Sequence, residues 1–318
     1  MTGMARVVVW NQFGPVAAER IRSSGFDVDL VDVAPWPPHR PPGRAADALF
    51  AFPYFGVTPE VRAAADVSWA DGIPWVHLGA SGLDLFPQPL LGGREIVTSA
   101  RGSSSAAIAE FVLAMMLARE KAIPALWTSA AGELQLGTLR KRTVGIVGYG
   151  TIGRRIAALA AAFGAEVIAT RRSDTPATAD DGTRLAGLAE VLAVADHLVL
   201  ALPATPSTSR MIDDAALASA KPGMHLINIA RGSILDHDAL LRALDSGRVG
   251  AASLDVTDPE PLPEDHPLRH DPRVRISPHV AWMEPESTDA LIESFVSNLG
   301  RRCAGEPLEG QVDLELGY

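Results

Sequence analysis

The sequence contains only one cysteine, Cys303, in its 318 residues, so it cannot form an internal disulfide bond. Proteins without disulfides are typical of reducing compartments, and we therefore expect a cytoplasmic protein. The segment around the thiol, GRRCAGEPL, offers nothing that would activate it, which favours a structural role for Cys303 over a catalytic one. We also expect no bound metal ion.

Long apolar runs and long basic runs are missing as well. No window of about 20 residues is both apolar and uncharged, which argues against a transmembrane helix. The N-terminal MARVVVW is too short for the apolar part of a signal peptide. The 28 Lys and Arg residues against 38 Asp and Glu give a net charge of −10. We therefore expect neither a nucleic-acid nor a membrane partner, although a local cationic pocket can still bind a small anion.

Hydrophobic residues make up 47% of the chain, and its length suits about two domains of ~150 residues each. In the first 98 residues, five short apolar or alternating runs predict the strands of a small α/β layer. These runs are RVVVWN, GFDVDLVDV, ADALFAF, PWVHLGA and EIVTS, with a proline-rich loop at residues 35–44. A helix is predicted over residues 104–123, with Ser103–Ser105 at its start and Pro124 beyond its end. It is apolar almost all round, so we expect it to be buried between domains or between subunits.

Strands alternate regularly with helices from residue 143 onward, which predicts parallel βαβ units in a doubly wound sheet. The strand segments are TVGIVG, EVIAT, HLVLAL, HLINIA, VGAASLDV and RVRISPHV. The last segment, STDALIESFVSNLGRRCAG, predicts a helix that returns to pack on the first unit.

The turn GYGTIG, residues 148–153, predicts a dinucleotide-binding site because it follows a strand and opens a helix. Gly148 permits the tight turn, Gly150 lets a pyrophosphate approach the backbone, and Gly153 lets the helix pack on the strand. The helix N-terminus then offers free N–H groups to the phosphates.

Arg171 stands at the end of the next strand, where enzymes that use NAD usually carry a carboxylate for the ribose hydroxyls. Arg171, Arg172 and the hydroxyl of Ser173 can instead donate to a 2′-phosphate, so we predict NADPH as the preferred cofactor, with NADH also possible. The alternative is a solvated arginine pair.

Three later segments place polar residues just past apolar strands, where ligands of open α/β sheets bind. LINIARGSILD contains Arg231, ASLDVTDPEPLP contains Asp255 and Glu260, and RISPHVAW contains His279. One Arg, one Glu and one His beside a nicotinamide suit hydride transfer to a 2-oxo acid. The other seven histidines lack such a context and are interpreted as structural or solvated.

The segments GYGTIG, NIARGSILD, LDVTDPEPLP and SPHVAW, in this order, make the chain resemble the D-isomer-specific 2-hydroxyacid dehydrogenase family, in particular glyoxylate/hydroxypyruvate reductases. The resemblance implies an α/β protein of two Rossmann-like lobes with doubly wound parallel sheets. The nucleotide lobe, residues 99–286, would be inserted into a smaller, flavodoxin-like catalytic lobe made of residues 1–98 and 287–318. It also implies a homodimer with the nucleotide lobes in contact.

The same resemblance implies a role for each catalytic residue. Arg231 would bind the substrate carboxylate and polarise the 2-oxo group, and His279 would exchange a proton with the carbonyl oxygen. Glu260 would hydrogen-bond His279, orient it and favour its protonated form, although a purely structural role in its proline-flanked loop is the alternative. Asp255 would position the nicotinamide carboxamide or support the site.

Further residues are implied around the two ligands. The cofactor side includes Tyr149, Thr151 and Ile152 of the turn, Leu202 and Pro203 of LALPAT, and Ile229 and Ala230. In HLGASGLDLF, backbone N–H groups around Ala80, Ser81 and Gly82 would bind the substrate carboxylate. Tyr54 and Trp282 would line the pocket, with a packing role equally open for each. Ala100 stands where an asparagine is frequent in the family, a small departure at the junction of the lobes.

We therefore predict an oxidoreductase that uses NADPH and a small 2-oxo acid, with glyoxylate or hydroxypyruvate as the favoured substrates. One alternative is the same scaffold acting on phosphite or formate, although Ser81 replaces the lysine of related phosphite-oxidising enzymes. Another is a non-enzymatic, NAD(H)-sensing corepressor.

Overall fold

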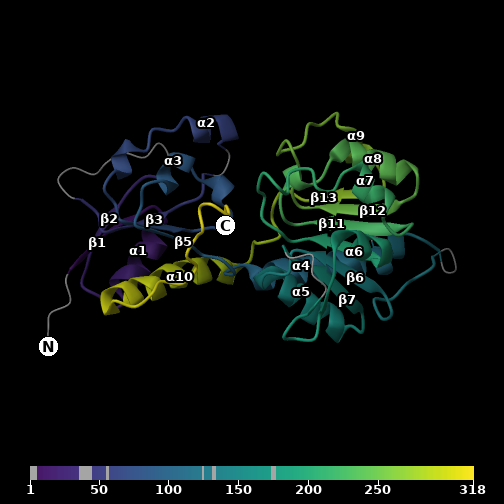
Figure 1. Cartoon of the computed structure of the whole chain (residues 1–318), viewed down its shortest axis with the longest axis horizontal. Helices are drawn as coiled ribbons and strands as arrows, with labels where there is room; N and C mark the ends of the chain where they lie inside the picture. Colours follow the sequence, from purple (N-terminus) through teal and green to yellow (C-terminus); the bar gives the residue numbers. More distant parts are fainter. Residues whose placement is uncertain (1–5, 36–44, 55–56, 124, 131–133, 173–176) are drawn as a thin grey trace. The chain divides into compact units, whose positions relative to one another are not determined.

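The computed structural model describes residues 6–35, 45–54, 57–123, 125–130, 134–172 and 177–318. The chain divides into two α/β units: unit 1 comprises Met1–Ser104 and Glu284–Tyr318, and unit 2 comprises Ser105–Met283. Figure 1 labels their helices and strands. The boundaries expected from the sequence, at residues 99 and 286, stay a prediction of the domain organisation.

Unit 1 contains a five-stranded parallel sheet in the order β2-β1-β3-β4-β5, the order of flavodoxin-like folds. Its strands correspond to the five apolar runs predicted from the sequence, which confirms that part of the fold. They are β1 (Val7–Asn11), β2 (Val28–Asp32), β3 (Ala48–Ala51), β4 (Trp75–Leu78) and β5 (Ile96–Ser99).

Helices cover both faces of this sheet. Side chains alternate between the faces along each strand, so both faces carry apolar side chains against which helices pack. On one face, Phe50 stacks on Phe295 of α10 with ring centroids 4.6 Å apart. Trp10 and Leu49 point into a separate apolar cluster that contains Leu90 of α3. The C-terminal helix therefore packs on the first unit, as predicted (Figure 1). The helices of unit 1 are α1 (Gly14–Arg22), α2 (Pro59–Ala63), α3 (Gln88–Leu91) and α10 (Pro285–Ala304), with short 3₁₀ turns at Ser68–Ala70 and Leu83–Leu85.

Unit 2 contains an eight-stranded sheet in the order β13-β12-β11-β10-β6-β7-β9-β8, which is parallel apart from its last pair. The predicted doubly wound sheet is thus confirmed. The strands are β6 (Thr143–Val147), β7 (Glu166–Thr170), β8 (Ala177–Thr178), β9 (Arg184–Leu185), β10 (His197–Leu200), β11 (Met224–Asn228), β12 (Val249–Leu254) and β13 (Val274–Ile276). The β8–β9 hairpin was not predicted, because two-residue strands carry no readable periodicity.

Two apolar clusters lie on opposite faces of the unit 2 sheet. Leu198 and Leu200 of β10 pack with residues of α6, α7 and α8, whereas Val199 packs with residues of α4 and α5. In Figure 1, α7 and α8 lie on one side of β11, β12 and β13, and α4 and α5 lie on the other. The helices are α4 (Ser105–Glu120), α5 (Thr151–Ala162), α6 (Leu188–Val194), α7 (Asp214–Ala218), α8 (His237–Asp245) and α9 (Pro267–His270), with 3₁₀ turns at Ala125–Trp127 and Gly232–Ile234.

Helix α4 is shorter than predicted and is not buried all round. Val112 and Met116 are buried, but Glu110, Ala114 and Arg119 are exposed in the described chain. Among the described residues α4 contacts α5 and β11, and its exposed positions show that its apolar composition overstates its burial within the chain.

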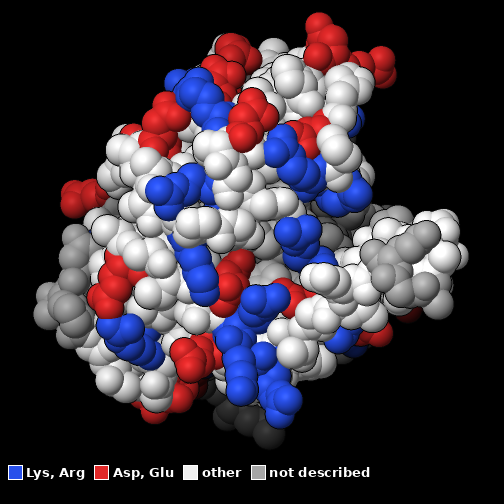
Figure 2. Space-filling view, turned by 90° about the vertical axis from the view of Figure 1, so that its right-hand side faces the viewer, with Lys and Arg blue, Asp and Glu red and all other residues white. Residues whose placement is uncertain are grey.

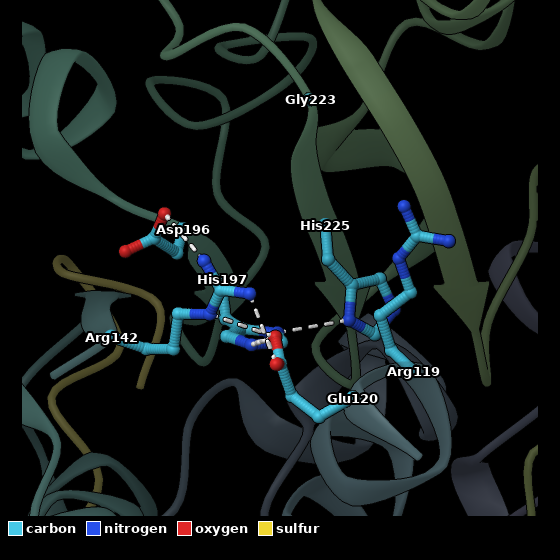
Figure 3. A pocket seen from close by; sticks show the side chains of 7 residues that line it. All are labelled: Arg119, Glu120, Arg142, Asp196, His197, Gly223 and His225. Carbon is cyan, nitrogen blue, oxygen red and sulfur yellow. Dashed lines mark hydrogen bonds and ion pairs between the residues drawn. The ribbon is translucent and has the colours of Figure 1, made fainter. Parts of the chain in front are cut away.

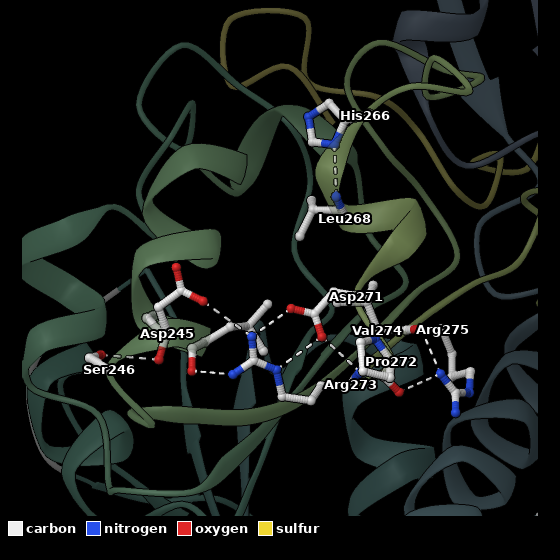
Figure 4. A network of polar contacts seen from close by, with 11 residues as sticks. Asp245, Ser246, His266, Leu268, Asp271, Pro272, Arg273, Val274 and Arg275 are labelled. Atoms are coloured by element: carbon white, nitrogen blue, oxygen red, sulfur yellow. Dashed lines mark hydrogen bonds and ion pairs between the residues drawn. The ribbon is translucent and has the colours of Figure 1, made fainter.

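Charged groups of opposite sign are interleaved on the surface. On the face shown in Figure 2, Lys and Arg side chains gather toward the middle with Asp and Glu among them. Arg273 is one paired example (Figure 4): its guanidinium donates to Asp271 at 2.6 and 2.9 Å and to the carbonyl of Leu244 at 2.5 Å. It thereby joins the start of β13 to the last turn of α8, where helix carbonyls lack partners within the helix.

Candidate active site

The three predicted catalytic residues lie on loops that leave neighbouring strands. Arg231 follows β11, Glu260 follows β12, and His279 follows β13. Because β11, β12 and β13 are adjacent and parallel, their carboxyl ends lie along one edge of the sheet. We call this edge, with its three loops, the carboxyl edge.

Glu260 and His279 form a direct pair at the carboxyl edge. Nδ1 of His279 lies 2.7 Å from Oε1 of Glu260. Burial raises the pKa of Glu260, but the hydrogen bond and charge of His279 outweigh burial and hold that pKa below its ordinary value. The amide of Thr257 and the charge of Arg231 act in the same direction. Glu260 is therefore an anion at neutral pH and can orient the imidazole.

The backbone turn that carries His279 is held by Asp255. The carboxylate of Asp255 accepts hydrogen bonds from the amides of Val280 and Ala281, both at 3.0 Å, and from the hydroxyl of Ser277 at 2.7 Å. Its carbonyl accepts from the amide of His279 at 2.9 Å. His279 has φ = 56°, a left-handed conformation that is uncommon for a residue with a side chain. These four bonds compensate for that strain, so Asp255 holds the turn of His279, while its role toward a cofactor stays a prediction.

Trp282 also contacts this turn. Its indole N–H donates to the carbonyl of His279 at 3.0 Å, and the side chain is half-buried. The bond fixes the ring against the turn of His279. A role of Trp282 in lining the substrate pocket stays a prediction.

The loop of Arg231 is shaped by two neighbours that the sequence analysis did not select. The side chain of Asn228 donates to the carbonyl of Arg231 at 2.9 Å and accepts from the amide of Ala230 at 3.0 Å. A Cβ at Gly232 would lie 2.0 Å from the carbonyl carbon of Thr257. The absence of a side chain at Gly232 thus lets the Arg231 loop lie directly against the loop of Glu260.

The glycine turn has the geometry that a dinucleotide requires. Gly148 has φ = 104°, and a Cβ there would collide with the backbone of Ala201 and Leu202. A Cβ at Gly153 would lie 2.3 Å from the carbonyl oxygen of Gly148, so α5 packs closely on the turn. Gly150 faces open space, and no side chain caps α5 at this end. The free amides and the open space fit a pyrophosphate at the start of α5.

The other predicted cofactor residues lie around this turn. Arg171 and Arg172 are exposed directly after β7, and Ser173 lies outside the described residues. The remaining residues, which follow β10, β11 or the glycine turn, are Leu202, Pro203, Ile229, Ala230, Thr151 and Ile152. Their contacts with a cofactor stay predictions.

The predicted substrate residues of unit 1 divide into two groups. Ala80, Ser81 and Gly82 follow the carboxyl end of β4, as a ligand-binding loop would. Tyr54 is buried in the core of unit 1 beside Phe86, and burial raises the pKa of its hydroxyl to about 12 despite a hydrogen bond with Gln12. Burial favours packing as its role.

A second Glu–His–Arg cluster lies at the opposite end of the strands, and we call this end of the sheet the amino edge (Figure 3). His197 Nε2 lies 3.2 Å from Glu120 Oε1, and its Nδ1 lies 3.1 Å from Nδ1 of His225. Arg142 pairs with Glu120 at 3.0 Å, and Nε2 of His225 lies 2.9 Å from Ser253 Oγ. The cluster borders a small cavity of about 90 Å³.

A comparison with known protein families identifies the family of the chain. Residues 111–281 match the model of the D-isomer specific 2-hydroxyacid dehydrogenase NAD binding domain. The chain belongs to this family. The match confirms the resemblance inferred from the sequence. The family consists of NAD(P)-dependent oxidoreductases.

Among the relatives of this chain, the D-3-phosphoglycerate dehydrogenase of Mycobacterium bovis is 37% identical over 222 residues. That match covers 66% of the chain and only 41% of the longer mycobacterial protein. Glyoxylate/hydroxypyruvate reductase A of Serratia proteamaculans is 38% identical over 179 residues, which are 55% of the chain and 56% of that protein.

Among solved structures, a D-isomer specific 2-hydroxyacid dehydrogenase from Xanthobacter autotrophicus in complex with NADPH and MES superposes with a TM-score of 0.80 and 26% identity. The match covers 98% of this chain and 99% of that one.

The described residues contain no group of three His, Cys, Asp or Glu side chains that could hold a metal ion. No described helix combines the length and apolar character needed to cross a membrane.

Proposed function

We propose that this protein transfers hydride between a nicotinamide dinucleotide and C2 of a 2-oxo acid. One observation carries the proposal: the Glu260–His279 pair, at 2.7 Å, lies beside the Arg231 loop at the carboxyl ends of adjacent strands. An acid, its orienting carboxylate and a guanidinium are the groups that reduction of a 2-oxo acid needs.

Each side chain has a defined task in the reduction. The reduced cofactor supplies the hydride that reaches C2. His279 gives the proton of Nε2 to the carbonyl oxygen, while Nδ1 stays bonded to Glu260. Arg231 binds the substrate carboxylate through its planar fork and draws electron density from the carbonyl group. In the reverse direction His279 takes the proton back.

We assign NADPH as the preferred cofactor. Arg171 and Arg172 stand exposed after β7, where a carboxylate would repel a 2′-phosphate, and both can donate to it. The Xanthobacter neighbour was solved with NADPH, whereas other structural neighbours carry NAD.

We assign small 2-oxo acids, glyoxylate or hydroxypyruvate, as substrates. Relatives named for these substrates support this choice, and the phosphoglycerate dehydrogenases among the relatives make a phosphorylated 2-hydroxy acid the competing substrate. We further propose that the protein is a cytoplasmic homodimer without a nucleic-acid or membrane partner.

The test is a panel of glyoxylate, hydroxypyruvate, pyruvate and 3-phosphohydroxypyruvate, each assayed at 340 nm with NADPH and with NADH. We expect kcat/KM to be highest for glyoxylate or hydroxypyruvate with NADPH. Higher kcat/KM with NADH would overturn the cofactor assignment, and no turnover of any 2-oxo acid despite cofactor binding would overturn the activity.

A further inference from the structure

A polar cluster joins the glycine turn to the β8–β9 hairpin. The hydroxyl of Tyr149 donates to Oδ2 of Asp181 at 2.6 Å and can accept from the hydroxyl of Thr183 at 2.6 Å. The guanidinium of Arg154 lies 4.9 Å from the centroid of the Tyr149 ring and 3.7 Å from Asp181. The side chain of Asp181 also accepts from the amide of Thr183 at 3.1 Å, which fixes the tip of the hairpin.

The cluster is buried on the side of Tyr149. The residue is 8% exposed, and its ring belongs to the apolar cluster beneath α4 and α5. Burial first, and then the hydrogen bond to Asp181, raise the pKa of Tyr149, while the bond from Tyr149 lowers the pKa of Asp181. The phenol therefore stays protonated and donates to a carboxylate, which is the stronger kind of hydrogen bond.

Strand pairing connects this cluster with Arg171. The amide of Gly148 donates to the carbonyl of Thr170 at 3.2 Å, so the residue before Tyr149 is bonded to the residue before Arg171. Among the residues that the structure describes, β8 pairs with β9 alone, and β9 pairs with β7 over two residues. A ribbon of this length is not stable alone. The bonds to Tyr149 therefore help to hold the hairpin whose β9 pairs with β7, the strand that ends at Thr170 directly before Arg171.

We propose that Tyr149 is a positioning residue: its hydroxyl anchors the β8–β9 hairpin and so holds Arg171 and Arg172 for the 2′-phosphate of NADPH. The inference rests on the proposed NADPH preference and deepens it. Asp180 and Asp181 lie at the hairpin tip, so the anchor also keeps the carboxylate of Asp181 paired with Tyr149 and Arg154. NADH lacks the 2′-phosphate, and its binding does not depend on this anchor.

The test compares cofactor affinity in Tyr149→Phe and the wild type, measured by fluorescence titration with NADPH and NADH. Phe keeps the ring under Arg154 and removes only the hydroxyl. We expect the Kd for NADPH to rise about fivefold or more while the Kd for NADH changes less than twofold. Equal changes in both Kd values would indicate a merely structural role and overturn the proposal.

Two further variants sharpen the result. Asp181→Asn keeps an oxygen that accepts from Tyr149, and its exposed pairing with Arg154 contributes little, so we expect both Kd values within twofold of the wild type. Tighter NADPH binding in Asp181→Asn would show that charge repulsion, not anchoring, matters. Arg184→Gln, in β9 of the same hairpin, removes an ion pair with Glu190 of α6 and serves as the matched control, with no change in selectivity expected.

The outcomes separate the two proposals. A wild-type chain that binds NADPH no better than NADH overturns the cofactor assignment and the anchoring with it. A wild-type preference that persists in Tyr149→Phe overturns the anchoring alone. If Tyr149→Phe does not fold, Thr183→Val removes the second partner of the hydroxyl and must lower the NADPH preference in the same direction.

Discussion

The two edges of the unit 2 sheet carry the same three residue types in opposite settings. At the carboxyl edge, Glu260 and His279 are 2.7 Å apart, the side chain of His279 is 22% exposed, and no described residue pairs with its Nε2. At the amino edge, His197 is 1% exposed and both of its ring nitrogens have partners. An accessible nitrogen, rather than the Glu–His pair itself, is what makes a histidine available for proton transfer.

At the amino edge, one arrangement of protons satisfies the hydrogen bonds of both histidines, His197 and His225. His197 donates from Nε2 to Glu120, its Nδ1 accepts from Nδ1 of His225, and Nε2 of His225 accepts from the hydroxyl of Ser253. This arrangement requires both imidazoles to be neutral. Burial lowers the pKa of His197, although Glu120 opposes it, and burial is the main cause that lowers the pKa of His225 to about 3. The amino edge therefore stabilises the fold and has no free proton to give.

The arginines of the two edges should differ strongly in their effect on the reaction. Arg231→Lys keeps the charge but loses the planar fork, so we predict a higher KM for the 2-oxo acid and a lower kcat, with kcat/KM reduced about a hundredfold. Arg142→Lys at the amino edge should leave both constants within twofold of the wild type. Initial rates with glyoxylate measure both. Comparable losses of kcat/KM in the two variants would contradict the functional distinction between the carboxyl edge and the amino edge.

The two carboxylates should differ in their effect on pH dependence. Glu260→Gln keeps a hydrogen-bond acceptor but removes the carboxylate, so we expect reduction at pH 7 to fall about tenfold. Because activity is then no longer lost when Glu260 is protonated, the optimum should move to lower pH. Glu120→Gln should leave the shape of the pH profile unchanged. A pH–rate profile of kcat/KM for the wild type and both variants measures these two effects. An unshifted optimum in Glu260→Gln would argue for a purely structural Glu260.

Acid stability should depend on the amino edge. Because the pKa of His225 is about 3 in the folded chain and about 6.5 unfolded, the unfolded state binds more protons between these values. The contribution of His225 to the free energy of unfolding is complete above pH 6.5. Below that pH, it is lost by about 1.4 kcal/mol per pH unit as the pH falls. In His225→Gln, the pH dependence of the unfolding free energy between pH 6 and 4.5 should decrease by about one proton. Urea titrations at several pH values measure it, and an unchanged slope would contradict the assignment.

The smallest effect concerns a backbone conformation that both edges share. Lys141 at the amino edge has φ = 71°, and His279 at the carboxyl edge has φ = 56°. Glycine adopts such angles without strain, so Lys141→Gly should stabilise the chain by about 0.5–1 kcal/mol and leave kcat unchanged. Lys141→Ala, which keeps the strain, should give no gain. Thermal unfolding of the two variants separates them, and equal melting temperatures would speak against the strain.

Local patterns predicted most of the frame of the molecule. Apolar runs such as ADALFAF and HLVLAL became strands, the glycine turn opens α5, and the segments containing Arg231, Glu260 and His279 follow neighbouring strands. These features depend on periodicity and on residues close in sequence.

Features that depend on contacts between distant residues were not predictable in this way. The three hydrogen bonds of the Asp255 carboxylate join residues 22–26 positions apart, and the bond between Glu120 and His197 spans 77 positions. Because no local pattern marks such pairs, Asn228, Ser277 and the histidines of the amino edge were not recognised as partners. A buried polar residue at either end of a strand is the signal that points to them.

The most direct test of the account compares His279→Ala with His197→Ala in glyoxylate reduction. We predict that His279→Ala lowers kcat/KM about 10²–10⁴-fold at pH 7 with the Kd for NADPH nearly unchanged. His197→Ala, assayed where it remains folded, should keep kcat/KM within a few-fold of the wild type while lowering the unfolding free energy. Near-normal reduction by His279→Ala, or an equal loss in both variants, would contradict the assignment of proton transfer to the carboxyl edge.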